Sequence, residues 1–325
     1  MKVFLIRRVL ALIPLLLMVT FIAQALLVLS PGSYLSTIAN SPTVSEELLA
    51  LLKKQYHLES ENVFVRYWYW LSQALQGNFG YSFKFRVPVW SLIWERLFNT
   101  LLLAVTALAI SWGLALPLGM LAAVRRNTWI DRVTGLISFA GLSIPSVFFS
   151  LLMLLLAAKT GWFPTGGIHD QTYWDDFTAL QKVTDTLWHL ALPAFVLGTI
   201  GLAQYMRQMR SEMIETLAHD YIRTARAKGL SQSRVLFRHA LGNAINPLIT
   251  LFGFSLAYLL TGSVLTEVVF SWPGMGRLTV QALVEKDEPL VMASVVLLTI
   301  MLALGSLISD ILLALIDPRI RLEGQ

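Results

Sequence analysis

The sequence predicts an all-α integral membrane protein with six transmembrane helices. Of its 325 residues, 56% are hydrophobic and only 14% are charged, and the mean hydropathy is +0.64. The hydrophobic fraction and the mean hydropathy are higher than in soluble domains of this length, and the charged fraction is lower. A helix needs about 20 apolar residues to cross about 30 Å of hydrocarbon. The stretches of sufficient length are residues 9–29, 97–124, 133–158, 188–206, 244–266 and 290–316.

The distribution of basic residues predicts the orientation of these spans. Six crossings place both termini on one side, and that side carries 15 of the 25 Lys and Arg residues against about 7 acidic residues. The other side carries 10 basic and 13 acidic residues. Because short cytoplasmic loops are enriched in Lys and Arg, both termini and residues 207–242 are expected in the cytoplasm. This asymmetry also explains the net charge of +5 without a nucleic-acid partner.

The first apolar stretch allows a second interpretation. Lys2, Arg7 and Arg8 followed by apolar residues and Ala23-Gln-Ala25 could form a cleaved signal peptide. The apolar run continues to Leu29, however, and exceeds a typical signal core. An uncleaved first helix within residues 1–30 is therefore expected.

Three loops between the spans are expected on the outer side of the membrane. Residues 31–95 are too long for a bare connection and predict a helical periplasmic insertion, with amphipathic helices at 46–56 and 63–75 and a turn at 77–80. Its aromatic residues 67–70 could lie at the headgroup level or touch a partner. The acidic loop 159–187 includes His169 but matches no metal-ligand template, so a solvated loop is expected. In the third connection Pro273-Gly274 predicts a turn, and Trp272 could lie at the membrane interface.

Residues 207–242 form a polar, basic segment between two apolar stretches, so water must surround it. Gly229 predicts a left-handed helix stop with Lys228 in the last turn, and Ser231 can cap a second short helix carrying Arg234 and Arg238. One interpretation is a docking surface for a partner; the other is packing on the protein's own helices, with basic residues facing anionic lipid. The apolar stripe at helical spacing consists of Met213, Ile214, Leu217, Ala218, Tyr221, Ile222 and Ala225.

Several chemistries are excluded by missing residues. The absence of cysteine excludes disulfides and thiolate sites, and no Gly-Lys dipeptide can form a Walker phosphate loop. No HExxH or GxSxG pattern occurs. The spans lack the charged relay that an ion-coupled carrier normally needs, with Asp310 as one candidate near the inner surface. We therefore expect no enzymatic activity, no metal and no cofactor, and an energy source in another protein.

With these features in view, residues 207–247 resemble the cytoplasmic loop of binding-protein-dependent ABC importer permeases. Residues 220–230 read Asp-Tyr-Ile-Arg-Thr-Ala-Arg-Ala-Lys-Gly-Leu, close to the version in the dipeptide/oligopeptide/nickel branch. The general family pattern is Glu-Ala-Ala, three residues, Gly, nine residues, then Ile-x-Leu-Pro. Here Gly229 and Leu241 match it, whereas Arg223, His239 and Gly242 replace Glu, Ile and Pro. Residues 117–125, 266–277 and 317–321 also resemble that branch.

The resemblance implies an architecture and a set of partners. It implies a type I ABC importer permease fold over residues 96–316, with the tail 317–325 in the cytoplasm of a bacterium and the protein in its inner membrane. The implied partners are a second related permease subunit, two cytoplasmic ATPase subunits and a periplasmic or lipid-anchored solute-binding protein.

The resemblance implies functional roles for two groups of residues, at the positions that match the family's motifs. The residues implied to couple to the ATPase are Asp220, Tyr221, Arg223, Thr224, Ala225, Arg226, Lys228, Gly229 and Leu230. The residues of the outer-loop motif are Glu267, Phe270, Trp272, Pro273, Gly274, Gly276 and Arg277.

The resulting functional hypothesis is the permease subunit of an ATP-driven importer for di- and oligopeptides. Import of nickel, glutathione or another small solute is the alternative within the branch. A stand-alone channel, a secondary carrier and a non-transporting membrane scaffold are the alternatives from other classes. No residue is singled out for substrate binding. Prolines that could set helix kinks are Pro117, Pro145, Pro193 and Pro247.

Overall fold

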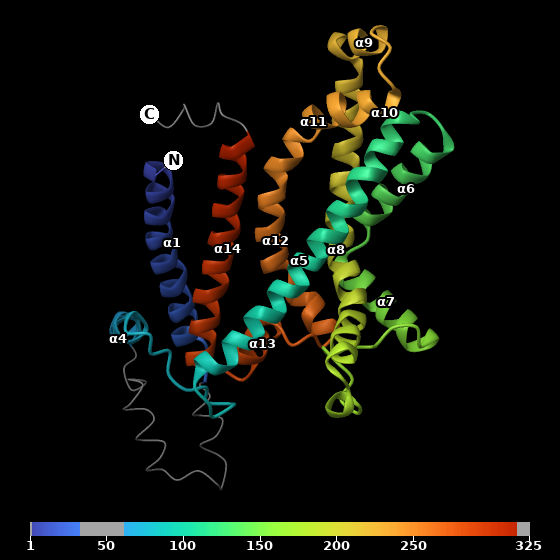
Figure 1. The fold of residues 1–325 in the computed structure, drawn as a ribbon. Helices are drawn as coiled ribbons and strands as arrows, with labels where there is room; N and C mark the ends of the chain where they lie inside the picture. Colours follow the sequence, from blue (N-terminus) through green and yellow to red (C-terminus); the bar gives the residue numbers. More distant parts are fainter. Residues whose placement is uncertain (1, 33–61, 317–325) are drawn as a thin grey trace, which may run out of the picture. The chain divides into compact units, whose positions relative to one another are not determined.

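Helices make up most of the chain that the computed structural model describes, namely residues 2–32 and 62–316 (Figure 1). The expected helix 46–56 and the tail motif 317–321 lie outside the described residues, as does the side chain of Asp310. The chain divides into two compact units, which are described separately. The first comprises Met1–Thr100 and Pro273–Ala303, and the second Leu101–Trp272 and Leu304–Gln325.

In its described residues, the first unit contains five helices or parts of helices, and its core lies where three of them meet. Its helices are α1 (Lys2–Leu29), α4 (Val63–Leu75), the beginning of α5 (Val89–Val124), α13 (Met275–Val284) and the beginning of α14 (Glu288–Ile316). Val89 and Ile93 of α5 pack with Met275 and Leu278 of α13 and with Leu290 of α14, and all five are buried. This core fixes the turn between α13 and α14 beside the start of α5.

The amphipathic helix expected at 63–75 is confirmed as α4. Asn62 caps it by accepting the Phe64 amide at 2.9 Å, and Gly77, with φ of +77°, follows its C-terminus in the expected turn. Within the aromatic group 67–70, the Tyr67 hydroxyl donates to the carbonyl of Leu17 at 3.0 Å, so this ring packs on α1. Trp68 instead is 73% exposed.

Charged side chains tie this insertion to the α13–α14 turn. Glu288 accepts a hydrogen bond from Gln24 at 2.7 Å and forms an ion pair with Arg66 of α4. Asp287, fully buried, accepts hydrogen bonds from the Ser82 hydroxyl at 2.5 Å and the Lys84 amide at 3.0 Å. These contacts join residues more than 200 positions apart, so local sequence patterns could not indicate them.

The second unit is organised around the 40-residue helix α8 (Ala179–Ala218), which packs against α6, α7, α11 and α12. A capping box begins α8, because Thr178 and Gln181 exchange side-chain and backbone hydrogen bonds. Figure 1 shows α9 at one end of α8 and the loop before α8 at the opposite end. The other elements are α6 (Trp129–Ser143), α7 (Ser146–Thr160), η1 (Trp174–Asp176), α9 (Asp220–Ala227), α10 (Gln232–Arg234), η2 (Val235–Ala240), α11 (Leu241–Ala244) and α12 (Asn246–Val269).

The helices that are able to span a membrane agree in part with the six spans predicted from the sequence. Among the described residues, three helical segments are long and apolar enough to span: Leu10–Leu29, Val89–Val124 and Glu288–Ile308. Two bent helix pairs raise the number to as many as five. The predicted fifth span corresponds to α12, some of whose side chains lie outside the described set. The count of six remains a prediction.

The predicted third span, 133–158, is wrong as a continuous helix. It is divided into α6 and α7, with a bend of 106° between them. The cause is Pro145, because a residue before proline is pushed out of helical conformation, and Ile144 is extended with φ of −84° and ψ of 121°. Pro117 and Pro193 lie inside α5 and α8, and Pro247 lies in the first turn of α12.

Candidate functional site

The strongest candidate site is α9 with the turn that follows it. After Lys228, Gly229 adopts φ of +75°, the left-handed conformation expected from the sequence. The Gly229 amide donates to Arg226 O at 2.9 Å and the Leu230 amide to Ala225 O at 3.4 Å. These two bonds form the Schellman motif that ends many helices. The motif fixes the direction in which the chain leaves α9.

The apolar face of α9 is buried against the chain itself. Ile222 is 0% exposed and Ala225 7%, and both pack in a cluster with Met209 and Met213 of α8 and Val235 of η2. Of the two interpretations of the apolar stripe, packing on the protein's own helices therefore holds for Ile222 and Ala225, and partner docking is wrong for these two side chains. Burying an isoleucine side chain contributes about 1.5–3 kcal/mol, so Ile222, with the smaller Ala225 beside it, attaches α9 to α8.

The polar face of α9 is exposed. Arg223 and Asp220 form a pair at 3.2 Å with side chains 73% and 92% exposed, so this pair adds little stability. Arg226 and Lys228 are exposed as well. Tyr221, 41% exposed, accepts a hydrogen bond from Asn243 at 2.9 Å. Thr224 is also exposed, and its hydroxyl donates to the Asp220 carbonyl at 3.0 Å. The face therefore presents three basic side chains from a short, anchored helix.

The second expected helix takes a different form. Ser231 occupies the N-cap position of α10, but its side chain makes no capping hydrogen bond. The chain then enters η2, a π-helical turn, and continues into α11, so Arg234 and Arg238 lie on different elements. Val235 and Ala240 of η2 are buried in the α8–α9 cluster, which accounts for a wider turn that keeps both inward. The prediction of one regular helix here is wrong.

A partly buried ion pair lies at the same end of the second unit. Arg210 of α8 contacts Asp131 of α6 through Nε–Oδ1 at 2.5 Å and Nη2–Oδ2 at 2.9 Å. Asp131 also accepts the Asn127 amide at 2.9 Å. This pair was not predicted from the sequence. The feature that could have indicated it is Asp131, the one acidic residue among the arginines of residues 125–132.

Gly119, within the motif at 117–125, marks a close approach between α5 and α8. A Cβ at Gly119 would lie 2.7 Å from both the Met206 carbonyl oxygen and the Met209 Cβ. Only glycine permits this separation. The motif thus brings α5 against the same part of α8 that holds α9.

In the second unit, the outer-loop motif is buried rather than interfacial. Trp272 is 0% exposed, so its expected place at the membrane interface is wrong. Phe270 is 1% exposed and packs with Leu192 and Val196 of α8. Glu267 is fully buried and accepts the Ser263 hydroxyl at 2.9 Å. The sequence predicted that the fifth span ends at residue 266 and placed Glu267 in the outer-loop motif, so the burial of this carboxylate was not expected.

The rest of the motif belongs to the first unit, where it begins α13. Pro273 accepts a hydrogen bond from the Asn99 side chain at 2.9 Å, and the Met275 amide donates to the Thr100 hydroxyl at 2.8 Å. Gly274 is the extended N-cap residue. Gly276 is buried and Arg277 half-buried. The polar contacts indicate a structural role for these residues.

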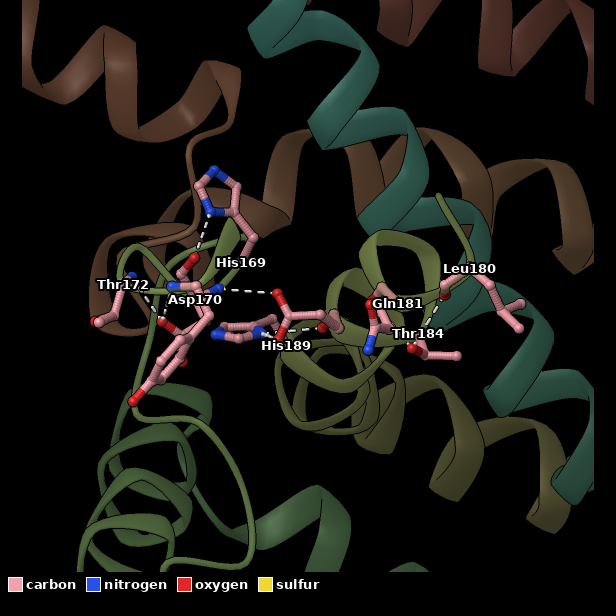
Figure 2. A network of polar contacts seen from close by, with 9 residues as sticks. His169, Asp170, Thr172, Leu180, Gln181, Thr184 and His189 are labelled. Atoms are coloured by element: carbon pink, nitrogen blue, oxygen red, sulfur yellow. Dashed lines mark hydrogen bonds and ion pairs between the residues drawn. The ribbon is translucent and has the colours of Figure 1, made fainter. Parts of the chain in front are cut away.

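The acidic loop before α8 is held by a local polar network (Figure 2). The Asp170 amide donates to the Asp185 carboxylate at 2.8 Å, and His189 lies 3.3 Å from the same carboxylate. The Thr172 amide, donating at 2.7 Å, lowers the pKa of the Asp170 carboxyl below its ordinary value. Among the described residues, no group of three or more acidic or histidine side chains could hold a metal ion.

Comparison with known proteins identifies the architecture. Residues 115–322 match the family model described as binding-protein-dependent transport system inner membrane component, and residues 1–104 match the model of its N-terminal part. The chain belongs to this family. Members are permease subunits rather than enzymes, and they are multi-pass membrane proteins.

Several relatives of this permease family match almost end to end. The oligopeptide transport system permease protein AppB of Bacillus subtilis (strain 168) is 40% identical, with 98% of this chain and 99% of the relative covered. The dipeptide transport system permease protein DppB of Escherichia coli (strain K12) is 36% identical, with 98% of each covered. The glutathione transport system permease protein GsiC of Salmonella typhi is also 36% identical, with 98% of each covered.

A solved structure supports the same permease fold. The inward-facing MetNI methionine ABC transporter aligns with 70% of this chain and 96% of its own, with a TM-score of 0.56 and 18% identity. At this identity the likeness establishes the fold alone.

Proposed function

We propose that this chain is a membrane subunit of an ATP-driven importer and forms half of a pathway for di- and oligopeptides. The observation that carries the proposal is the 40% identity, over 98% of the chain, to a permease named for oligopeptide transport. The 36% identity to a dipeptide permease supports the same substrate class. The glutathione permease of equal identity keeps glutathione, nickel or another small solute as the alternative within the branch.

The proposed contact with the ATPase is the exposed face of α9. Arg223, Arg226 and Lys228 offer positive charge to an acidic groove rim, while Ile222 and Ala225 keep the helix attached to α8. Because burial holds α9 at the end of a 40-residue helix, a push on α9 is transmitted to α8. The nine residues from Asp220 to Leu230 named by motif form the helix and its terminal turn, so they act as one element.

The proposed cycle is alternating access. ATP binding closes the ATPase pair and moves α9 together with the end of α8, and the pathway between the two permease subunits opens outward. A solute-binding protein then delivers the peptide, and hydrolysis restores the inward-facing state. The proposed partners are a second related permease, two ATPase subunits and a periplasmic or lipid-anchored binding protein. The proposed location is the bacterial inner membrane with both termini in the cytoplasm.

A secondary carrier is the rival that one observation favours. Glu267 is a buried carboxylate near the end of a predicted span, as an ion-coupled relay would require. Its hydrogen bond with Ser263, one turn earlier on the same helix, equally suits a structural role. The two functions differ in whether transport requires ATP.

The test is reconstitution of the chain with its co-purifying partners in proteoliposomes. We expect an ATPase with a Walker loop and a second six-span permease to co-purify, and labelled tripeptide uptake to require ATP and the binding protein. ATP-independent uptake by the chain alone would establish the carrier or channel. Absence of uptake together with absence of an ATPase partner would favour the scaffold.

A further inference from the structure

We propose that the pocket between α6 and α8 binds the headgroup of an anionic phospholipid at its basic end, with the acyl chains along its apolar end. The pocket lies within the second unit and is lined at one end by Arg132, Arg207 and Arg210, and at the other by Phe139 and Leu142. The inference rests on the proposed placement of residues 125–132 and 207–218 at the cytoplasmic surface, where anionic headgroups are found.

The basic end of the pocket carries a net positive charge. Three arginines face one aspartate, Asp131, which leaves two net positive charges in the lining. Arg210 and the Asn127 amide already occupy Asp131. In the described part of the chain, no ion pair or side-chain hydrogen bond engages Arg132 or Arg207, and both are exposed. Guanidinium groups bind phosphate oxygens with two parallel hydrogen bonds, so this end suits a phosphate.

Along the pocket, the lining of both α6 and α8 changes from basic to apolar residues in the same direction. Asp131 pairs with Arg210, whereas Gly141 faces Ala203, where an added Cβ would lie 3.0 Å from the Ala203 Cβ. The two helices are therefore antiparallel, and both pass from arginine to apolar residues over about 15 Å, the length of ten helical residues. Phe139 is 72% exposed and Leu142 41%. A molecule that satisfies both ends carries an anionic head and an apolar tail.

Gly135 keeps the middle of the pocket open. It lines the pocket, and an added Cβ there would meet nothing within 4 Å. A large side chain at this position would therefore fill the space without removing any charge. This provides a steric variant that is independent of the arginines.

The experiment is native mass spectrometry of the purified full chain, titrated with dioleoylphosphatidylglycerol in detergent. We expect one tightly retained lipid, and weaker retention of dioleoylphosphatidylcholine. Arg132→Gln/Arg207→Gln should weaken phosphatidylglycerol binding about fivefold for each arginine removed, and Gly135→Leu should weaken it by blocking the space. Arg125→Gln, which removes a neighbouring charge outside the lining, should leave binding unchanged.

Four results would overturn the proposal. Equal retention of the two lipids, or equal retention by the double variant and Arg125→Gln, would show that the pocket does not select the headgroup. Displacement by millimolar inorganic phosphate alone would assign a free-anion site. Loss of the lipid when a second permease assembles would assign the pocket to that interface. Uptake is not a readout here, so failure of the lipid site leaves the importer proposal intact, and failed uptake leaves lipid binding measurable.

Discussion

Asp131 and Arg210, 79 positions apart, form a two-point ion pair that joins α6 to α8. The side chain of Asp131 is 9% exposed and that of Arg210 is 34% exposed. Two parallel bonds to a sheltered carboxylate are stronger than an exposed single contact. The pair therefore positions α6 on the helix whose next turns carry α9.

Removing one partner of this pair should destabilise the protein. Arg210→Gln leaves a sheltered carboxylate without its cation, and we expect a loss of about 1–3 kcal/mol, below the cost for a fully buried pair because Arg210 is partly exposed. The measurement is the thermal midpoint of the purified chain in detergent, followed by tryptophan fluorescence. Arg223→Gln, which breaks the exposed pair with Asp220, is the control and should leave the midpoint unchanged. Equal shifts in both variants would contradict this prediction.

A methyl group at Gly119 should be costly, whereas one at Gly113 should not. The Cβ of Gly119→Ala would press against the Met206 carbonyl, which is part of the backbone of α8 and cannot rotate away. Overpacking of this kind costs about 1–3 kcal/mol. Gly113, on the same helix, has nothing within 4 Å of an added Cβ. Thermal midpoints of the two variants provide the comparison, and a Gly119→Ala midpoint at or above that of Gly113→Ala would refute the close approach.

The sequence was most informative where structure is determined locally. Amphipathic spacing predicted α4 with the bounds that the structure has, and the glycine after Lys228 predicted the left-handed end of α9. Both depend on residues within a few positions of each other. Pro145 was recognised as a possible kink, but its 106° break could not be derived, because the angle depends on how α6 and α7 pack.

Tertiary contacts account for what the sequence could not supply. Periodicity identified the apolar stripe containing Ile222 and Ala225, but it could not say whether α8 or a partner covers the stripe. The structure shows that Met209, Met213 and Val235 cover it. For the same reason the partner of Asp131 and the burial of Glu267 could not be assigned before the fold was known.

Anchoring and docking by α9 should be separable by two substitutions. Ile222→Ala removes a fully buried side chain, which typically costs about 2–5 kcal/mol, and should loosen α9 from α8. Arg226→Gln removes only an exposed charge and should leave α9 attached while weakening retention of the ATPase. Limited chymotrypsin digestion beside Tyr221 and Phe237, sites that both variants keep, measures detachment. Faster cleavage of Arg226→Gln, or unchanged cleavage of Ile222→Ala, would contradict the assignment.

The conformation of Gly229 should matter more than the space around it. An added Cβ there meets nothing within 4 Å, so any defect must arise from its φ of +75° or from contact with a partner. Left-handed backbone costs a side chain about 1–2 kcal/mol, most for β-branched residues and least for Asn. We therefore expect Gly229→Val to lower ATP-driven uptake and transport-stimulated ATP hydrolysis at least about fivefold, with normal membrane insertion. Gly229→Asn should retain most activity, because asparagine tolerates this conformation. If both variants lose uptake equally, the requirement is for a small surface at the ATPase contact; if both transport normally, the turn has no part in coupling.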